Sequence, residues 1–240
     1  MKITNLITAD ILQGIDDINK KCHAMHIPSP PVQFISAEVR DADGTLSEVY
    51  KSKSNTWVRN AYNYLSSVFL PCDTIQGTDT FGAGSMSLKS TAGTTRRKDA
   101  FVPYLTSGLI KYIFNEAANA NFGIVIGTGD TAESFEHTSL SAIVAHGTGA
   151  GQMSYAIGTN TAATYDSGTK KWTSAFSRTF VNSSGSDITV KEIGVVYSLN
   201  YQTGVSDNFL ITRDVLASPV TVANGQTLTI TYTSEITYPA

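Results

Sequence analysis

Residues 172–233 contain five runs rich in β-branched and aromatic side chains, separated by turns rich in glycine, asparagine and serine. This arrangement is typical of an antiparallel sheet. In the last run, residues 227–233, Leu228, Ile230 and Tyr232 face one way while threonines face the other. A period of two with one apolar side predicts a half-buried strand. We therefore expect a rigid C-terminal β-sandwich block without a cluster of catalytic groups.

Length and charge narrow the class of protein. A chain of 240 residues can form one large β domain, or a β domain with a smaller partner. Charged residues make up only 15% of it, against a typical value of about 25%. The net charge of −3 argues against a general binder of nucleic acid or of anionic membranes. No apolar run approaches the roughly 18 residues of a membrane span, and no signal peptide is expected at the start.

The predicted fold is mainly β: an antiparallel β-sandwich, immunoglobulin-like or jelly-roll-like, with an N-terminal helix, one further helix and a long flexible loop. Residues 1–31 are expected to form a docking arm, made of the helix and a proline-rich linker. Residues 32–240 then form a β-rich body. Within the body we expect a helix at residues 57–70, the long loop at residues 73–99 and the sandwich block at residues 172–233.

The N-terminal helix is predicted from apolar residues at helical spacing, with Thr8 or Asp10 as its cap. The apolar positions are Ile11, Ile15, Ile18, Cys22 and Met25. This stripe is too short for a free-standing coiled coil, so it docks either on its own domain or on a neighbouring subunit. For the second case we expect Ile11, Ile15, Ile18 and Met25 at the interface.

Large apolar side chains in the predicted helix and strands are the expected core anchors, with a tryptophan at the start of the second helix as the largest. They are Trp57, Tyr62, Phe180, Ile193, Leu228, Ile230 and Tyr232. Cys22 and Cys72 lie in dissimilar settings and are expected to be buried free thiols, which is typical of synthesis in the cytoplasm.

The predicted loop at residues 73–99 is rich in glycine, serine and threonine and ends in Arg96, Arg97 and Lys98. Loops of this length inside a compact domain are usually functional or disordered. Two interpretations stay open: a segment that becomes ordered against a partner subunit, or a mobile surface loop with a weak hairpin. The three basic residues either meet a partner at an interface or are simply solvated.

The segment Gly127-Thr128-Gly129-Asp130 follows an apolar run and could suggest a phosphate-binding turn. The dinucleotide fingerprint needs a further glycine where Ala132 stands, and the lysine of a P-loop is absent. We therefore predict a tight turn and no nucleotide cofactor.

Other polar groups are weak candidates for metal or acid–base chemistry. His23 and His26 have helical spacing next to Cys22, but no further ligands complete a zinc site. The fragment Asp41-x-Asp43-Gly44 lacks the acid expected at the twelfth position of a calcium loop, so it predicts a hairpin turn. Asp130, Glu133 and Glu136 are spaced like a carboxylate cluster, yet their polar surroundings are typical of a solvated edge.

Several stretches, taken in order, carry a resemblance to a known family. They are Asp-Ala-Asp-Gly (41–44), Trp-Val-Arg-Asn-Ala-Tyr-Asn (57–63), Gly-Ile-Val-Ile-Gly-Thr-Gly (123–129), Gly-Thr-Gly-Ala-Gly-Gln (147–152), Arg-Thr-Phe-Val-Asn-Ser-Ser-Gly (178–185) with Val-Lys-Glu-Ile-Gly (190–194), and Arg-Asp-Val-Leu-Ala-Ser-Pro-Val-Thr-Val (213–222) through Thr-Tyr-Thr (231–233). Together they resemble virion structural proteins of tailed bacteriophages, a family of tail, neck or capsid-associated β-sandwich proteins. The resemblance covers residues 37–70 and 122–233.

This family has no catalytic motif, so the resemblance implies a non-enzymatic subunit of a virion with no cofactor and no small-molecule substrate. Its partners would be copies of itself in a symmetric oligomer and other virion proteins. The run Glu192-Ile193-Gly194 is similar to β modules at the base of tail fibres, which favours the tail, neck ring or collar. The alternatives are a capsid decoration protein and a glycan- or receptor-binding module, which would use Tyr155, Tyr165, Tyr197 and Tyr201 as stacking platforms.

Overall fold

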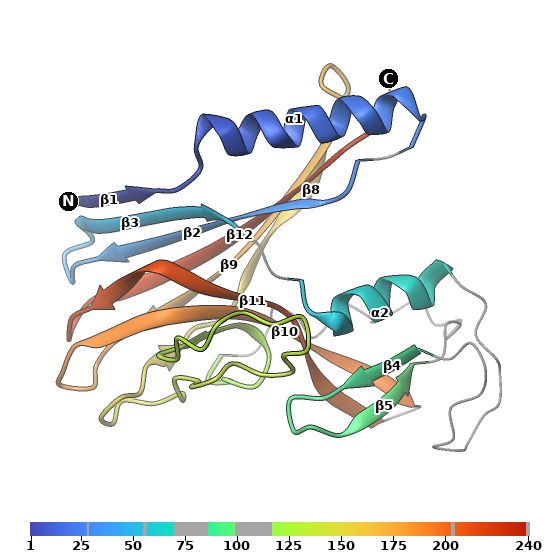
Figure 1. Ribbon diagram of the computed structural model, residues 1–240. Helices are drawn as coiled ribbons and strands as arrows, with labels where there is room; N and C mark the ends of the chain where they lie inside the picture. Colours follow the sequence, from blue (N-terminus) through green and yellow to red (C-terminus); the bar gives the residue numbers. More distant parts are fainter. Residues whose placement is uncertain (28, 55–56, 70–85, 99–116, 203–204, 239–240) are drawn as a thin grey trace. The chain divides into compact units, whose positions relative to one another are not determined.

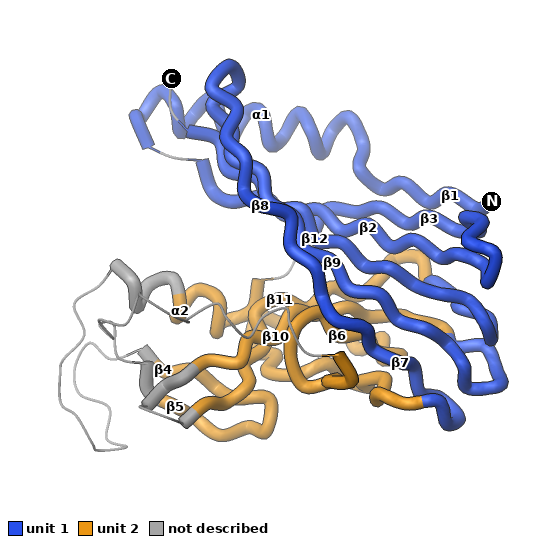
Figure 2. Tube along the Cα trace, turned by 180° about the vertical axis from the view of Figure 1, so that it is seen from behind, with its two compact units in different colours: residues 1–55, 148–188, 220–240 blue, residues 56–147, 189–219 orange. Residues whose placement is uncertain are grey.

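The computed structural model describes residues 1–27, 29–54, 57–69, 86–98, 117–202 and 205–238 (Figure 1). The predicted class is confirmed: the fold is mainly β, with sandwich-like antiparallel sheets, an N-terminal helix and one further helix. The chain divides into two compact units (Figure 2). Unit 1 comprises residues 1–55, 148–188 and 220–240, and unit 2 comprises residues 56–147 and 189–219. This division differs from the predicted separation at residue 31.

Unit 1 contains one sheet of seven strands and the helix α1 (Figure 1). Its elements are β1 (Lys2–Asn5), α1 (Ala9–Ala24), β2 (Val32–Arg40), β3 (Leu46–Lys53), β7 (Ser154–Tyr155), β8 (Thr159–Asp166), β9 (Lys171–Val181) and β12 (Thr227–Thr237). The strand order is β1-β3-β2-β12-β9-β7, and β8 pairs with β9 beside β7. β1 pairs with β3 in parallel, whereas the other pairings are antiparallel.

The strand β12 lies between β2 and β9 and so joins the two halves of this sheet. Leu228 stands opposite Val39 on one side and Phe180 on the other. Leu228, Ile230 and Tyr232 are fully buried, while the threonines between them are only half-buried. The alternation predicted for this strand is therefore confirmed, because its apolar side forms part of the core.

The helix α1 begins after Thr8, whose hydroxyl accepts a hydrogen bond from the Ile11 amide and caps the helix. Cys22 is buried and is a free thiol, whereas Cys72 lies outside the described residues. After the helix, the Ser29 amide donates a hydrogen bond to the carbonyl of Thr237 at the end of β12. Residues 1–31 are thus built into unit 1, because this bond and the β1–β3 pairing tie both of their ends to the sheet.

Unit 2 contains a three-stranded sheet of order β11-β10-β6, a two-stranded sheet and the helix α2. Its elements are α2 (Arg59–Phe69), β4 (Met86–Lys89), β5 (Thr95–Lys98), β6 (Gly123–Gly127), β10 (Ile188–Gln202) and β11 (Val205–Val222), of which the last two extend by a few residues into unit 1. The predicted helix begins at Arg59 because Trp57 pairs with Thr212 and the Val58 amide bonds to the Ile211 carbonyl.

Part of the predicted loop at residues 73–99 is a hairpin, since β4 and β5 pair antiparallel; residues 73–85 and 99 lie outside the described residues. The side chain of Asn60 in α2 ties this hairpin to β11. Its amide nitrogen donates to the carbonyls of Lys89 (2.8 Å) and Leu210 (3.1 Å), and its oxygen accepts from the Lys89 amide (2.9 Å). In the same unit, Leu88, Leu199 and Phe209 form a buried cluster.

Candidate functional site

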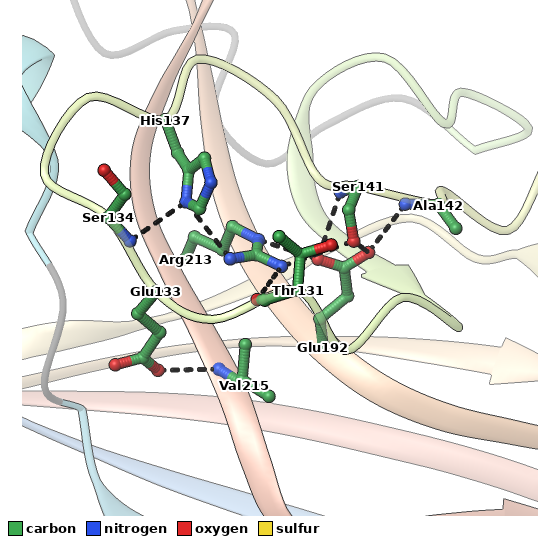
Figure 3. A network of polar contacts seen from close by, with 9 residues as sticks. All are labelled: Thr131, Glu133, Ser134, His137, Ser141, Ala142, Glu192, Arg213 and Val215. Carbon is green, nitrogen blue, oxygen red and sulfur yellow. Dashed lines mark hydrogen bonds and ion pairs between the residues drawn. The ribbon is translucent and has the colours of Figure 1, made fainter.

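Unit 2 contains a fully buried ion pair between Glu192 of β10 and Arg213 of β11 (Figure 3). Arg213 Nε lies 2.7 Å from Glu192 Oε2, and both side chains are 0% exposed. Burying two charges costs several kcal/mol per ion unless each is paired and hydrogen-bonded. The remaining contacts of the pair therefore decide what it can do.

The loop that follows β6, residues 128–143, supplies most of the remaining contacts of the ion pair (Figure 3). Glu192 accepts hydrogen bonds from the Ala142 amide (2.8 Å) and from the amide and hydroxyl of Ser141 (both 3.1 Å). Arg213 Nη2 donates to the Thr131 carbonyl at 2.9 Å and to the Ser141 hydroxyl at 3.3 Å. Both charged groups are thus engaged on several sides. The arrangement holds the loop against the sheet.

His137 completes the network through Nδ1, which lies 3.1 Å from both Arg213 Nη1 and the Ser134 amide (Figure 3). Guanidinium and amide groups can only donate, so Nδ1 accepts and the ring proton resides on Nε2. Burial, followed by the positive charge of Arg213, lowers the pKa of His137; Glu192 and Glu133 oppose the shift more weakly. The folded protein therefore holds this imidazole neutral.

We expect His137→Asn to remove a pH-dependent component of stability. The unfolded chain takes up a proton near pH 6.5, whereas the folded chain resists it until the pH reaches the lowered pKa. The free energy of unfolding of the unaltered protein should therefore fall as the pH drops below about 6.5. The variant keeps an acceptor oxygen but cannot titrate, so its stability should fall less.

The measurement is urea denaturation followed by tryptophan fluorescence. Trp57 lies in unit 2 and Trp172 in unit 1, and they are the two tryptophans of the chain, so a Trp172→Phe background reports unit 2. His146→Asn, which removes an exposed imidazole of the same unit outside the network, is the matched control. Parallel pH profiles for His137→Asn and the unaltered protein would contradict the neutral state assigned to His137.

Gly127 and Gly129 are close to the ion pair rather than to an open turn. A β-carbon on either glycine would come within 2.6 Å of a Glu192 carboxylate oxygen. The two glycines in the segment Gly127-Thr128-Gly129 thus make room for a negatively charged side chain. The space beside these glycines is thus filled by the Glu192 side chain.

The three acids of the same loop are not brought together. Asp130 pairs with Lys191 at 2.8 Å, a contact that lowers the pKa of Asp130. Glu133 accepts a hydrogen bond from the Val215 amide at 2.8 Å, and Glu136 pairs with Arg59. Each carboxylate therefore has its own partner, and the geometry offers no pair for acid–base catalysis.

The hairpin turn predicted at residues 41–44 is present. Gly44 has a φ of +86°, which glycine adopts without strain, and its amide donates to the Asp41 carbonyl. Asp43 Oδ1 accepts from the Thr45 amide at 2.8 Å, and this bond lowers the pKa of Asp43. The two aspartates belong to a turn between β2 and β3.

The predicted interface residues have different surroundings. On α1, Ile11 and Ile15 are half-buried, whereas Ile18 is 48% and Met25 60% exposed; Leu12, which was not predicted, is 50% exposed. Arg96 is half-buried and its Nε lies 3.1 Å from Asp207 Oδ2, so it is engaged within unit 2. Arg97 and Lys98 belong to β5, but their side chains lie outside the described part.

The predicted core is confirmed at five of seven positions: Phe180, Ile193, Leu228, Ile230 and Tyr232 are fully buried. Trp57 is only half-buried. The prediction is wrong for Tyr62, which is 52% exposed because the first turn of α2 directs it to the surface, where its ring contacts those of Trp57 and Phe135.

Sequence reasoning missed the partnership of Glu192 and Arg213, although a signal existed. Both are charged residues within apolar strands, where a charge is tolerated only if it is paired.

Within the described residues, no group of three or more His, Cys, Asp or Glu side chains is placed to bind a metal ion. The described helices include none with the length and apolar character of a membrane span. Comparisons with models of protein families, with curated proteins and with solved structures gave no match.

Proposed function

We propose that this chain is a non-enzymatic structural subunit of a tailed-phage virion, located in the tail, neck ring or collar and assembled through contacts between subunits. The resemblance described above is the starting point of the proposal. The observation that carries it is a set of exposed apolar side chains on α1 and at its C-terminal cap, namely Leu12, Ile18 and Met25.

The helix α1 provides that surface. Leu12, Ile18 and Met25 are all about half exposed, although each could be buried if the helix had a further partner. The half-buried Ile11 and Ile15 belong to the same helix, so α1 is held in its own unit and still offers apolar side chains to another molecule. Ile11, Ile15 and Ile18 follow one side of the helix at steps of four and three, so a partner that contacts Ile18 would extend the apolar stripe already half-buried in unit 1.

The test is quantitative mass spectrometry of purified particles from the phage that encodes the chain, combined with imaging of a labelled chain. We expect a fixed copy number per particle and label on the tail, neck ring or collar. Label on the capsid shell would instead favour the decoration protein. If the chain occurs in infected cells but not in purified particles, the proposal is wrong.

A second candidate function, a glycan- or receptor-binding module, is favoured by one cluster in unit 1. Tyr165, Trp172 and Tyr238 are all exposed, with ring centroids 5.7 Å apart for Tyr165 and Trp172 and 6.1 Å apart for Tyr165 and Tyr238. Such rings present an apolar body with a polar edge, on which a sugar can stack.

Of the other tyrosines predicted as platforms, Tyr155 is buried, Tyr197 is mostly buried and the Tyr201 side chain lies outside the described part. On a glycan array, Trp172→Ala should abolish any binding, whereas Tyr62→Ala, an exposed ring of unit 2, should not.

A further inference from the structure

The strand β8 (Thr159–Asp166) is the outer edge strand of the sheet in unit 1 (Figure 2). All eight of its residues are exposed. Among the described residues it pairs with β9 alone, so one side of its backbone faces outward. An edge of this kind is a template for pairing with another strand.

The other described edges are short or covered. In unit 1, β1 has four residues and β7 has two. In unit 2, β6 has a bridge from Gly127 to Ile143. The edge strand β11 is longer, at 18 residues, but it has a bridge from Thr212 to Trp57 and is buried at residues 209–214. The four-residue β4 is covered by Asn60, and β5 also has only four residues. Among the strands that the structure describes, β8 is therefore exceptional because all eight of its residues are exposed.

The sequence of β8 also lacks the residues that usually protect an edge. It contains no lysine and no proline, and its single charge, Asp166, stands at its last position. A bulge between Thr161 and Thr164 increases the local twist but adds no charge. Proteins protect exposed edges with lysine, with proline or with bulges, and of these three β8 has the bulge alone.

We propose that β8 pairs with β8 of a second copy of this chain, antiparallel, about a two-fold axis between Ala162 and Ala163. This inference rests on the proposed function and names the surface through which two subunits would meet. Two-fold pairing uses the same surface on both copies, and the outward backbone groups of one strand satisfy those of the other.

The charge pattern of β8 selects this direction. In the antiparallel pair, Asp166 of one copy stands opposite Thr159 of the other, so the two carboxylates lie at opposite ends, roughly 24 Å apart for eight residues. That separation exceeds the Debye length of about 8 Å at physiological ionic strength. A parallel pair in register would place the two carboxylates side by side, which is destabilising.

The same register places Thr161 of each copy opposite Thr164 of the other, which gives two threonine pairs. Paired threonines are favourable neighbours across antiparallel strands. The centre of the interface is then small and uncharged, made of the four alanines that the bulge displays. The strand is self-complementary in the antiparallel direction.

The test uses two double variants of the full chain, Thr161→Lys with Thr164→Lys and Thr161→Glu with Thr164→Glu. In the proposed register each variant alone brings like charges opposite each other, so its dimer dissociation constant should rise at least about tenfold. When the two variants are mixed, every such pair becomes Lys–Glu, and dimers should return. Mass in solution is measured by analytical ultracentrifugation.

The matched control adds two lysines elsewhere, at Ser183 and Ala92, which are exposed turn residues. It should associate like the unaltered chain. If the unaltered chain is oligomeric and both double variants remain so, the β8 pairing is wrong while the virion function stands. A monomeric unaltered chain at all concentrations would also overturn the pairing, and the particle analysis above would then decide the function separately.

Discussion

Replacing Arg213 by methionine should lower the free energy of unfolding of unit 2 by about 3–5 kcal/mol. Methionine fills much of the same volume but leaves the Glu192 carboxylate buried without its cation, at a position where neither side chain is exposed to solvent. The loss of stability comes mainly from the unpaired, buried Glu192 carboxylate rather than from the lost attraction within the pair. Urea denaturation followed through Trp57 in the Trp172→Phe background measures it.

Arg59→Met is the matched control, because it breaks another Arg–Glu pair of unit 2, with Glu136, in which both side chains are 56% exposed. An exposed pair contributes only about 0–1 kcal/mol. Arg213→Lys should fall between the two, since it keeps the charge but loses the forked contacts to Thr131 and Ser141. If Arg213→Met and Arg59→Met lower the free energy of unfolding equally, the buried ion pair contributes no more to stability than the exposed one.

The second large effect is expected from Gly127→Ala, at about 1–3 kcal/mol of destabilisation. The added methyl group would lie 2.6 Å from a Glu192 carboxylate oxygen and 2.7 Å from the Ala142 carbonyl oxygen. The carbonyl belongs to the backbone and accepts a hydrogen bond from the Thr128 amide, so it cannot rotate away as a side chain would. The same fluorescence measurement applies.

Gly14→Ala is the control for this substitution, and it is followed through Trp172 in a Trp57→Phe background because Gly14 lies in unit 1. Gly14 lies inside α1 with nothing within 4 Å of the added carbon, and alanine in a helix is more stable than glycine by roughly 0.5–1 kcal/mol. We expect a small gain there and a loss at Gly127. If both substitutions raise the free energy of unfolding, the loop beside Glu192 must shift readily to admit the added methyl group, contrary to the packing described above.

The sequence predicted individual strands well because their alternation is local. The run at residues 227–233 lies within β12, and the apolar run at residues 122–127 contains β6. Two of the five runs in the C-terminal block, residues 208–216 and 218–222, were expected as separate strands. They form the single strand β11, because β11 is an edge strand and an edge tolerates Pro219. An alternating pattern carries no sign of the partner strand, so the place of β12 between β2 and β9 was not predictable.

The same reason explains the incomplete prediction of the site. Glu192 and Arg213 are each visible as a charge in an apolar strand, but their meeting depends on how β10 and β11 align. Arg96 was predicted at an interface, yet Asp207, 111 residues away along the chain, engages it. Ile18 of α1 and Met25 at its C-terminal cap are 48% and 60% exposed, and their predicted place at an interface stays a prediction.

The position of β12 has a consequence for biosynthesis. While the nascent chain is still on the ribosome, the β2–β3 hairpin can form, but β2 lacks its second neighbour until residues 227–237 have been translated. Contacts between such distant segments form slowly. A chain that stops before that point would therefore carry a bare apolar strand, the form in which newly made β proteins are most prone to mispair and aggregate.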